Sequence, residues 1–194
     1  MMQVLFLAAC VAVEPPVVPF PHPLITEVLY AVPTGPEGDV TGDGSRETNG
    51  DEFVELVNTH EKPINLRGYV LSGKASDDPK KRFKTLRFVF PSLTLGPGEV
   101  AVVFNGHGQT WTGPVGDTAA APEKGNEKFN GARVFTMNVD SARLGFSNKA
   151  DYVLLSAPDG SGIECITWGE IKAPAGVGLV EKAPEGARGS VMRR

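Results

Sequence analysis

Glycine and proline interrupt this chain at short intervals, and this limits what it can fold into. The 194 residues include 23 glycines and 16 prolines, many of them between short apolar runs. No stretch keeps apolar residues at positions i, i+3, i+4 and i+7 over three turns without meeting a glycine or proline, as an amphipathic helix would. Short apolar runs between turn residues are typical of all-β chains. The sequence therefore predicts an all-β fold.

The apolar runs read as strands separated by turns. Expected strands cover residues 24–30, 52–59, 64–73, 86–91 and 100–104. The clearest hairpin has two apolar strands on either side of residues 158–162, where Pro, Asp, Gly and Ser favour a turn. Strands at this spacing, with no helices between them, pair antiparallel, and about seven to nine of them form a β-sandwich. A closed barrel is the alternative.

Length and charge limit the classes of function. The chain suits one domain with a tail, and its 41% hydrophobic content can form a core without disulfide bonds. The net charge of −4 argues against specific nucleic-acid binding, which needs clustered Lys and Arg. The one basic run, Lys80 to Arg82, follows Asp77 and Asp78, which cancel its charge locally. We expect a solvated loop there.

The N-terminus has the character of an export signal, which we assign to residues 1–14. Residues 4–13 are unbroken apolar, long enough for a signal peptide and too short to span a bilayer. The motif LAAC resembles a bacterial lipobox and predicts lipidation at Cys10. Residues 15–23 contain five prolines and read as an extended spacer. No Lys or Arg precedes Arg46, so the basic segment that usually begins a signal peptide is absent. A frayed apolar N-terminus or an apolar first strand stays open as the alternative.

A pattern of short acids and hydroxyls precedes the second expected strand and resembles the start of an EF-hand calcium loop. Oxygen-bearing side chains alternate up to Gly44, at the position where that loop requires glycine. Position 12, where an EF-hand has a bidentate Glu, is Gly50. The sequence predicts one structural Ca²⁺. Its ligands would be Asp39, Thr41, Asp43, the carbonyl of Ser45, and an acid from Asp51 or Glu52. A solvated acidic turn without metal is the alternative.

Other polar and aromatic residues give weaker signals. Glu27 and Glu55 lie in mid-strand, where an acid–base pair is conceivable and a structural role is favoured. Cys165 lies in a strand-like run and reads as a buried, inert thiol. Trp111 lies in the irregular region 106–131, where we expect a turn cluster or short helix covering one end of the sandwich. It is a candidate ligand anchor, with core packing as the favoured alternative.

Several motifs together resemble the lamin tail domain family in its bacterial, secreted form. They are ITEV at 25–28, EFVELVN at 52–58, NLRGYVLS at 65–72, the region from FP to GPG at 90–98, and the final segment that contains ADYVLLSAPDGSGIECITWG. The resemblance covers residues 24–194 and implies an immunoglobulin-like β-sandwich. Two features depart from the family pattern. The insertion at 106–131 has no counterpart, and the chain stops where a last edge strand would begin.

The resemblance implies a binding module without catalytic activity. We therefore predict an exported protein of the extracellular space or cell envelope that binds a protein or an envelope polysaccharide, with one structural Ca²⁺. The alternative is an accessory domain of a metal-dependent hydrolase or nuclease. Its metal site would use Asp39, Asp43, Glu52 and Glu55. No nucleophile and base occur together in a recognisable motif, which favours the binding module.

Overall fold

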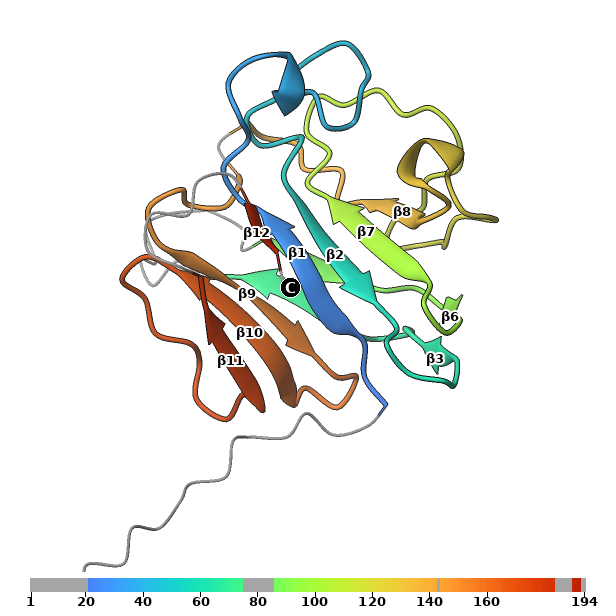
Figure 1. Ribbon diagram of the computed structural model, residues 1–194, viewed down its shortest axis with the longest axis vertical. Coiled ribbons are helices and arrows are strands. Elements are labelled where there is room, and N and C mark those ends of the chain that lie inside the picture. The colour runs from blue at the N-terminus through green and yellow to red at the C-terminus, as the bar shows by residue number, and fades with distance from the viewer. Residues whose placement is uncertain (1–20, 75–85, 143, 184–189, 193–194) are drawn as a thin grey trace, which may run out of the picture.

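The computed structural model describes residues 21–74, 86–142, 144–183 and 190–192. These residues form twelve short strands and two three-residue 3₁₀-helices (Figure 1). Over this described part of the chain, no helix is long and apolar enough to cross a membrane. The prediction of an all-β fold is confirmed.

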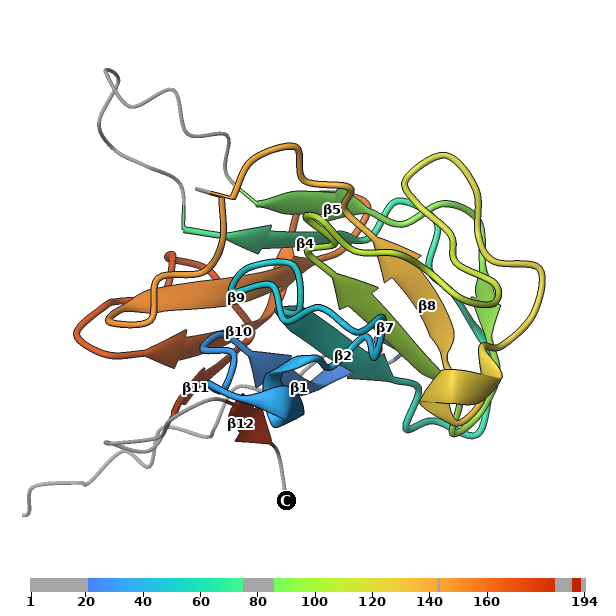
Figure 2. The same cartoon turned by 90° about the horizontal axis from the view of Figure 1, so that it is seen from above.

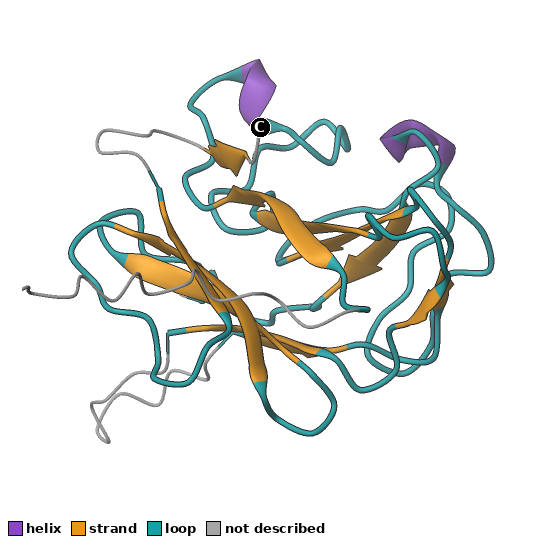
Figure 3. Ribbon diagram, turned by 60° about the horizontal axis from the view of Figure 1, so that its bottom comes forward, coloured by secondary structure: helices purple, strands orange, loops and turns teal. Residues whose placement is uncertain are grey.

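Two five-stranded sheets form the sandwich, and Figure 3 shows them as two layers. The first sheet has the order β12-β1-β2-β7-β8. Its strands are β1 (Leu24–Leu29), β2 (Phe53–Val57), β7 (Val100–Phe104), β8 (Arg133–Thr136) and β12 (Ser190–Met192). The second sheet has the order β11-β10-β9-β4-β5. Its strands are β4 (Val70–Gly73), β5 (Arg87–Val89), β9 (Asp151–Ser156), β10 (Gly162–Trp168) and β11 (Leu179–Lys182).

Two edge pairs depart from the antiparallel pattern that we expected. β8 runs parallel to β7, and β11 runs parallel to β10. The other pairs of both sheets are antiparallel, including the predicted β9–β10 hairpin. The reason is the length of the connections. A tight hairpin reverses the chain, whereas a long connection allows it to return to the start of the neighbouring strand. Residues 105–132 form such a connection between β7 and β8.

The expected strand at 64–73 is divided into two. β3 (Ile64–Asn65) pairs with β6 (Thr94–Leu95) in a small third sheet, and β4 belongs to the second large sheet. Gly68 lies in the turn between them with φ of 82°, a conformation that side-chain-bearing residues rarely adopt. Its N–H donates to the carbonyl of Phe90. The interior glycine therefore ends one strand and begins the next.

The core lies between the inner faces of the two large sheets. Trp168 stacks on Tyr30 with ring centroids 4.4 Å apart, and Phe88 packs against Phe135 at 5.5 Å. The fully buried Glu164 of β10 accepts a hydrogen bond from the backbone N–H of Ile25 in β1, at 2.8 Å, which joins the two sheets. Cys165 is fully buried, as predicted, and burial raises the pKa of its thiol to about 12. It is therefore a core residue.

Candidate functional site

The outer face of the first sheet is also apolar where β2 and β7 lie side by side. Side chains alternate along a strand, so Val54 and Val103 point into the core, while Phe53 and Val102 point to the opposite face. Val102, Phe104, Ala132 and Val134 form the buried centre of a second hydrophobic cluster there. A strand that is apolar on both faces needs cover on both sides.

The insertion between β7 and β8 provides part of that cover (Figure 2). Phe129 and Trp111 pack against Phe104, with ring centroids 5.4 and 5.3 Å away. Phe129 ends the 3₁₀-helix η2 (Glu127–Phe129), whose first turn is capped by the side chain of Asn126. A short helix was one of the two structures predicted for this region, the other being a turn cluster. The insertion covers the outer face of the first sheet, however, and not one end of the sandwich. Trp111 packs against the second hydrophobic cluster. Its role as a ligand anchor stays a prediction.

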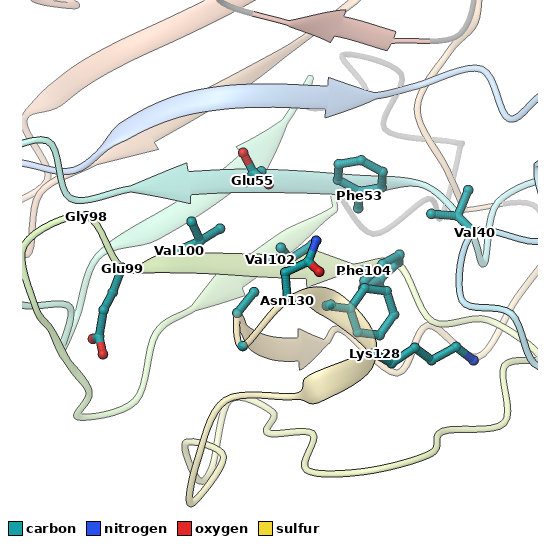
Figure 4. Close-up of a pocket in the computed structure, with 13 residues that line it drawn as sticks. Val40, Phe53, Glu55, Gly98, Glu99, Val100, Val102, Phe104, Lys128 and Asn130 are labelled. Atoms are coloured by element: carbon teal, nitrogen blue, oxygen red, sulfur yellow. The ribbon is translucent and has the colours of Figure 1, made fainter.

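A groove of about 490 Å³ remains where the insertion does not cover the sheet. Its floor consists of outward-facing residues of β2 and β7, and its wall is the segment from Lys128 to Ala132 (Figure 4). The floor residues are Phe53, Glu55, Val100, Val102 and Phe104. This volume lies within the range of about 300–1,000 Å³ typical of ligand pockets. We call this feature the outer groove.

Three charged side chains line the outer groove, and they differ in their partners. Glu99 accepts a hydrogen bond from the N–H of Gly96 at 2.7 Å and forms a long ion pair of 3.9 Å with Arg133. The ammonium of Lys128 donates to the carbonyl of Gly42 at 2.7 Å. Glu55 accepts a hydrogen bond of 2.6 Å from the hydroxyl of Thr26. The outer groove thus combines an apolar floor with a few polar groups.

The first two acids of the predicted calcium loop fold the loop around themselves. Asp39 accepts backbone hydrogen bonds from Asp43 and Gly44, at 3.0 and 2.9 Å. Asp43 accepts one from Ser45 at 2.8 Å and a second, at 2.6 Å, from Thr110 in the insertion. Every oxygen of these two carboxylates therefore already accepts an N–H donor.

Asp51 binds the loop from its far end. One carboxylate oxygen accepts a hydrogen bond from the N–H of Thr41 at 2.9 Å. The other accepts one from the N–H of Glu47 at 2.8 Å and one from the side-chain amide of Gln109 at 3.2 Å. Within the described ranges, no three residues of the His, Cys, Asp and Glu types are grouped so that they could hold a metal ion. Calcium binding stays a prediction, and an ion would have to share oxygens with these donors.

Glu52 faces the core and not the loop. Its side chain is 1% exposed, and it accepts a hydrogen bond of 2.9 Å from the N–H of Phe146. Burial raises the pKa of this carboxyl to about 9, which outweighs the lowering effect of that hydrogen bond, and the charge of Asp151 raises it further. Of the two acids considered for closing the calcium loop, only Asp51 has its carboxylate hydrogen-bonded to loop residues in the described part of the chain.

The acidic loop at residues 39–52 also holds the insertion in place over the sheet. The carboxylate of Asp43 accepts a hydrogen bond from the backbone N–H of Thr110, and the hydroxyl of Thr41 donates to the side-chain oxygen of Gln109. The Gln109–Asp51 and Lys128–Gly42 contacts add further connections. The acidic residues thus have a structural explanation that does not depend on a metal ion.

Comparison with known families agrees with this architecture. A family model described as the Lamin Tail Domain matches residues 23–170, most of the chain. This chain is a member of the lamin tail domain family. No curated protein sequence matches it significantly.

The match to the lamin tail domain covers both large sheets up to the end of β10. β11 and β12 follow the matched range. Ser190–Met192 pairs with β1 as an edge of the first sheet. Cys10 and the proposed export signal lie outside the described residues, as does the basic run from Lys80 to Arg82.

Sequence reasoning missed the outer groove of this lamin tail domain. One signal was present: β7 reads VAVVF and does not alternate, so both of its faces are apolar. The strand was predicted, but its outward apolar face was not recognised as the floor of a groove. The insertion that forms the groove wall reaches β7 only through tertiary contacts, which no local pattern predicts.

Proposed function

We propose that this lamin tail domain is an exported, non-catalytic module that binds a protein partner in the outer groove. The observation that carries the proposal is the apolar floor formed by Phe53, Val100 and Val102 beside an incomplete cover. Apolar surface left open beside polar residues is typical of interaction sites. The family consists of non-enzymatic interaction domains, which supports the same conclusion.

A binding role fits the chemistry of the described residues better than catalysis does. Asp39, Asp43 and Asp51 are engaged by backbone donors, and Glu52 is buried toward the core. Cys165 is inaccessible to a substrate. A protein partner is favoured over an envelope polysaccharide because the groove floor is mainly apolar, with two valines and two phenylalanines, and because Trp111 packs edge-on against Phe104 and does not line the groove.

Export to the cell envelope, lipidation at Cys10 and weak calcium binding complete the proposal. The apolar run and the LAAC motif support the first two. The acidic loop supports the third, with Asp39, Thr41, Asp43, Ser45 and Asp51 as the ligands. Calcium sites of extracellular modules bind with dissociation constants of about 0.1–1 mM, which suits an exported protein.

The test compares two matched valine variants in capture from an envelope extract. Val100→Asp places a charge in the groove floor at a partly exposed position. Val180→Asp places the same charge on β11, where the valine is 47% exposed. We expect wild type and Val180→Asp to capture the same protein and Val100→Asp to lose it, with unchanged circular dichroism in all three. Equal capture by Val100→Asp would overturn the proposal.

A further inference from the structure

We propose that the outer groove selects an extended protein segment that carries an arginine or lysine between apolar residues, with the cation bound at Glu55. This inference rests on the proposed function and specifies the chemistry of the partner. Three observations support it: the position of Glu55 in the groove floor, the apolar residues next to Glu55, and the partners that the other charged residues of the groove already have.

Glu55 is the charged residue placed among the apolar residues of the groove floor. On its own strand, the outer face has Phe53 two residues before it. Across the strand pair it lies opposite Val102 of β7. A cation that reaches Glu55 is therefore flanked by apolar groups that partly exclude water, which strengthens a charge-assisted hydrogen bond.

The charge of Glu55 has no basic partner within the described part of the chain. Both ion pairs found there, Arg133 with Glu99 and Lys182 with Glu170, involve other carboxylates. The hydrogen bond from Thr26 occupies one oxygen of Glu55, whereas an ionised carboxylate offers about four acceptor positions. Glu55 can therefore accept further donors, and a guanidinium or ammonium group supplies them together with the opposite charge.

The register of β1 on β2 places a second acidic residue on the same face. Glu27 is the cross-strand partner of Glu55, so both side chains project from the outer face. Of the two, Glu55 lines the outer groove. A cationic segment is electrostatically complementary to Glu55, whereas an acidic segment is disfavoured there.

The other two charged residues of the groove are less suited to this selection. The ammonium of Lys128 is bound to Gly42 of the acidic loop. Glu99 is already near Arg133 and caps the turn at Gly96. The apolar floor runs along two strands, so an extended segment matches it, because the alternate side chains of that segment repeat at about 7 Å, as those of the strands do.

The test uses two synthetic peptides that differ in one group. Each has alternating valine and threonine with capped ends. One has a central arginine, and the other has citrulline, its uncharged isostere. Binding to the full chain is followed by NMR through the backbone amides of Val102 and Phe104. We expect the arginine peptide to bind about tenfold more tightly than the citrulline peptide, and Glu55→Gln to remove most of this difference.

The control variant is Glu123→Gln, which removes one carboxylate outside the groove lining. It should leave the arginine preference unchanged. Equal binding of the two peptides in the groove would overturn the cation inference and leave the proposed function intact. If neither peptide shifts the groove amides, the inference also fails. The capture experiment with Val100→Asp then decides the proposed function separately.

Discussion

Both faces of the first sheet carry apolar side chains at β2 and β7, yet the two faces differ in how they are covered. On the inner face, Leu56, Ala101 and Val103 are fully buried against the second sheet. On the outer face, Phe53 and Val100 are only partly buried, beside an insertion that leaves the outer groove open. Burial by a second sheet thus closes the inner face completely, while partial cover by a loop leaves apolar surface of the outer face accessible.

Among single truncations, the largest loss of stability should come from shortening an aromatic side chain on the inner face. Phe135 is fully buried and packs against Phe88 and Phe90. Phe135→Ala leaves a cavity between the sheets and should lower the free energy of unfolding by about 3–5 kcal/mol. Urea denaturation measures this. Phe129→Ala, on the outer cluster, is the matched control and should cost less than half as much. Equal losses would contradict the contrast between the faces.

Two adjacent valines of β7 test the contrast with the same chemical change. Val103 points inward and Val102 outward. Val103→Ala should destabilise by about 2 kcal/mol, because it removes two methyl groups and leaves a cavity that a closed core cannot fully collapse around. Val102→Ala should cost about 1 kcal/mol or less, because the groove is open beside it. Thermal and urea unfolding measure the loss of unfolding free energy in each variant. A larger loss for Val102→Ala would reverse the assignment of the faces.

The buried acid on the inner side should make stability depend on pH. The pKa of Glu52 is raised from 4.5 to about 9, mainly by burial, so the folded chain retains a proton that the unfolded chain releases above pH 4.5. This contribution to stability is complete below pH 4.5 and is lost as pH rises toward 9, by up to about 1.4 kcal/mol per pH unit.

Glu52→Gln keeps a hydrogen-bond acceptor for Phe146 without a titrating proton. We expect the variant to lose this pH dependence in urea unfolding measured between pH 5 and pH 8. If the slope persists in Glu52→Gln, another group is its source.

The smallest effect expected is that of calcium on the acidic loop, which supports the insertion over the outer face. An ion at tenfold excess over its dissociation constant stabilises the folded chain by about 1.4 kcal/mol. For a chain of this size, that raises the melting temperature by about 3–5 °C. Melting with calcium, magnesium and chelator measures the shift. Asp43→Asn keeps a hydrogen-bonding oxygen and should abolish it. An equal shift in the variant would place the ion elsewhere.

Much of the fold could be predicted because its signals are local. β7 was predicted with the bounds that it has, and the β9–β10 hairpin follows from the turn residues at 158–162. The division of residues 64–73 was missed, because a glycine inside an apolar run does not show whether the chain bulges or turns. The parallel edge pairs were missed because their direction depends on long connections whose path is not a local property.

The candidate site likewise has features that the local sequence predicts and features that it does not. The sequence alone determined that residues 39–52 form an acidic, glycine-rich loop and that Asp39, Asp43 and Asp51 are available to it, because turn chemistry acts over a few residues. Tertiary packing set the burial of Glu52 against Phe146, the contacts of the loop with Thr110 and Lys128, and the position of Glu55 in an apolar groove. These outcomes depend on which distant segment covers each face of a strand, and covering a face is a matter of packing between elements that are remote in the chain.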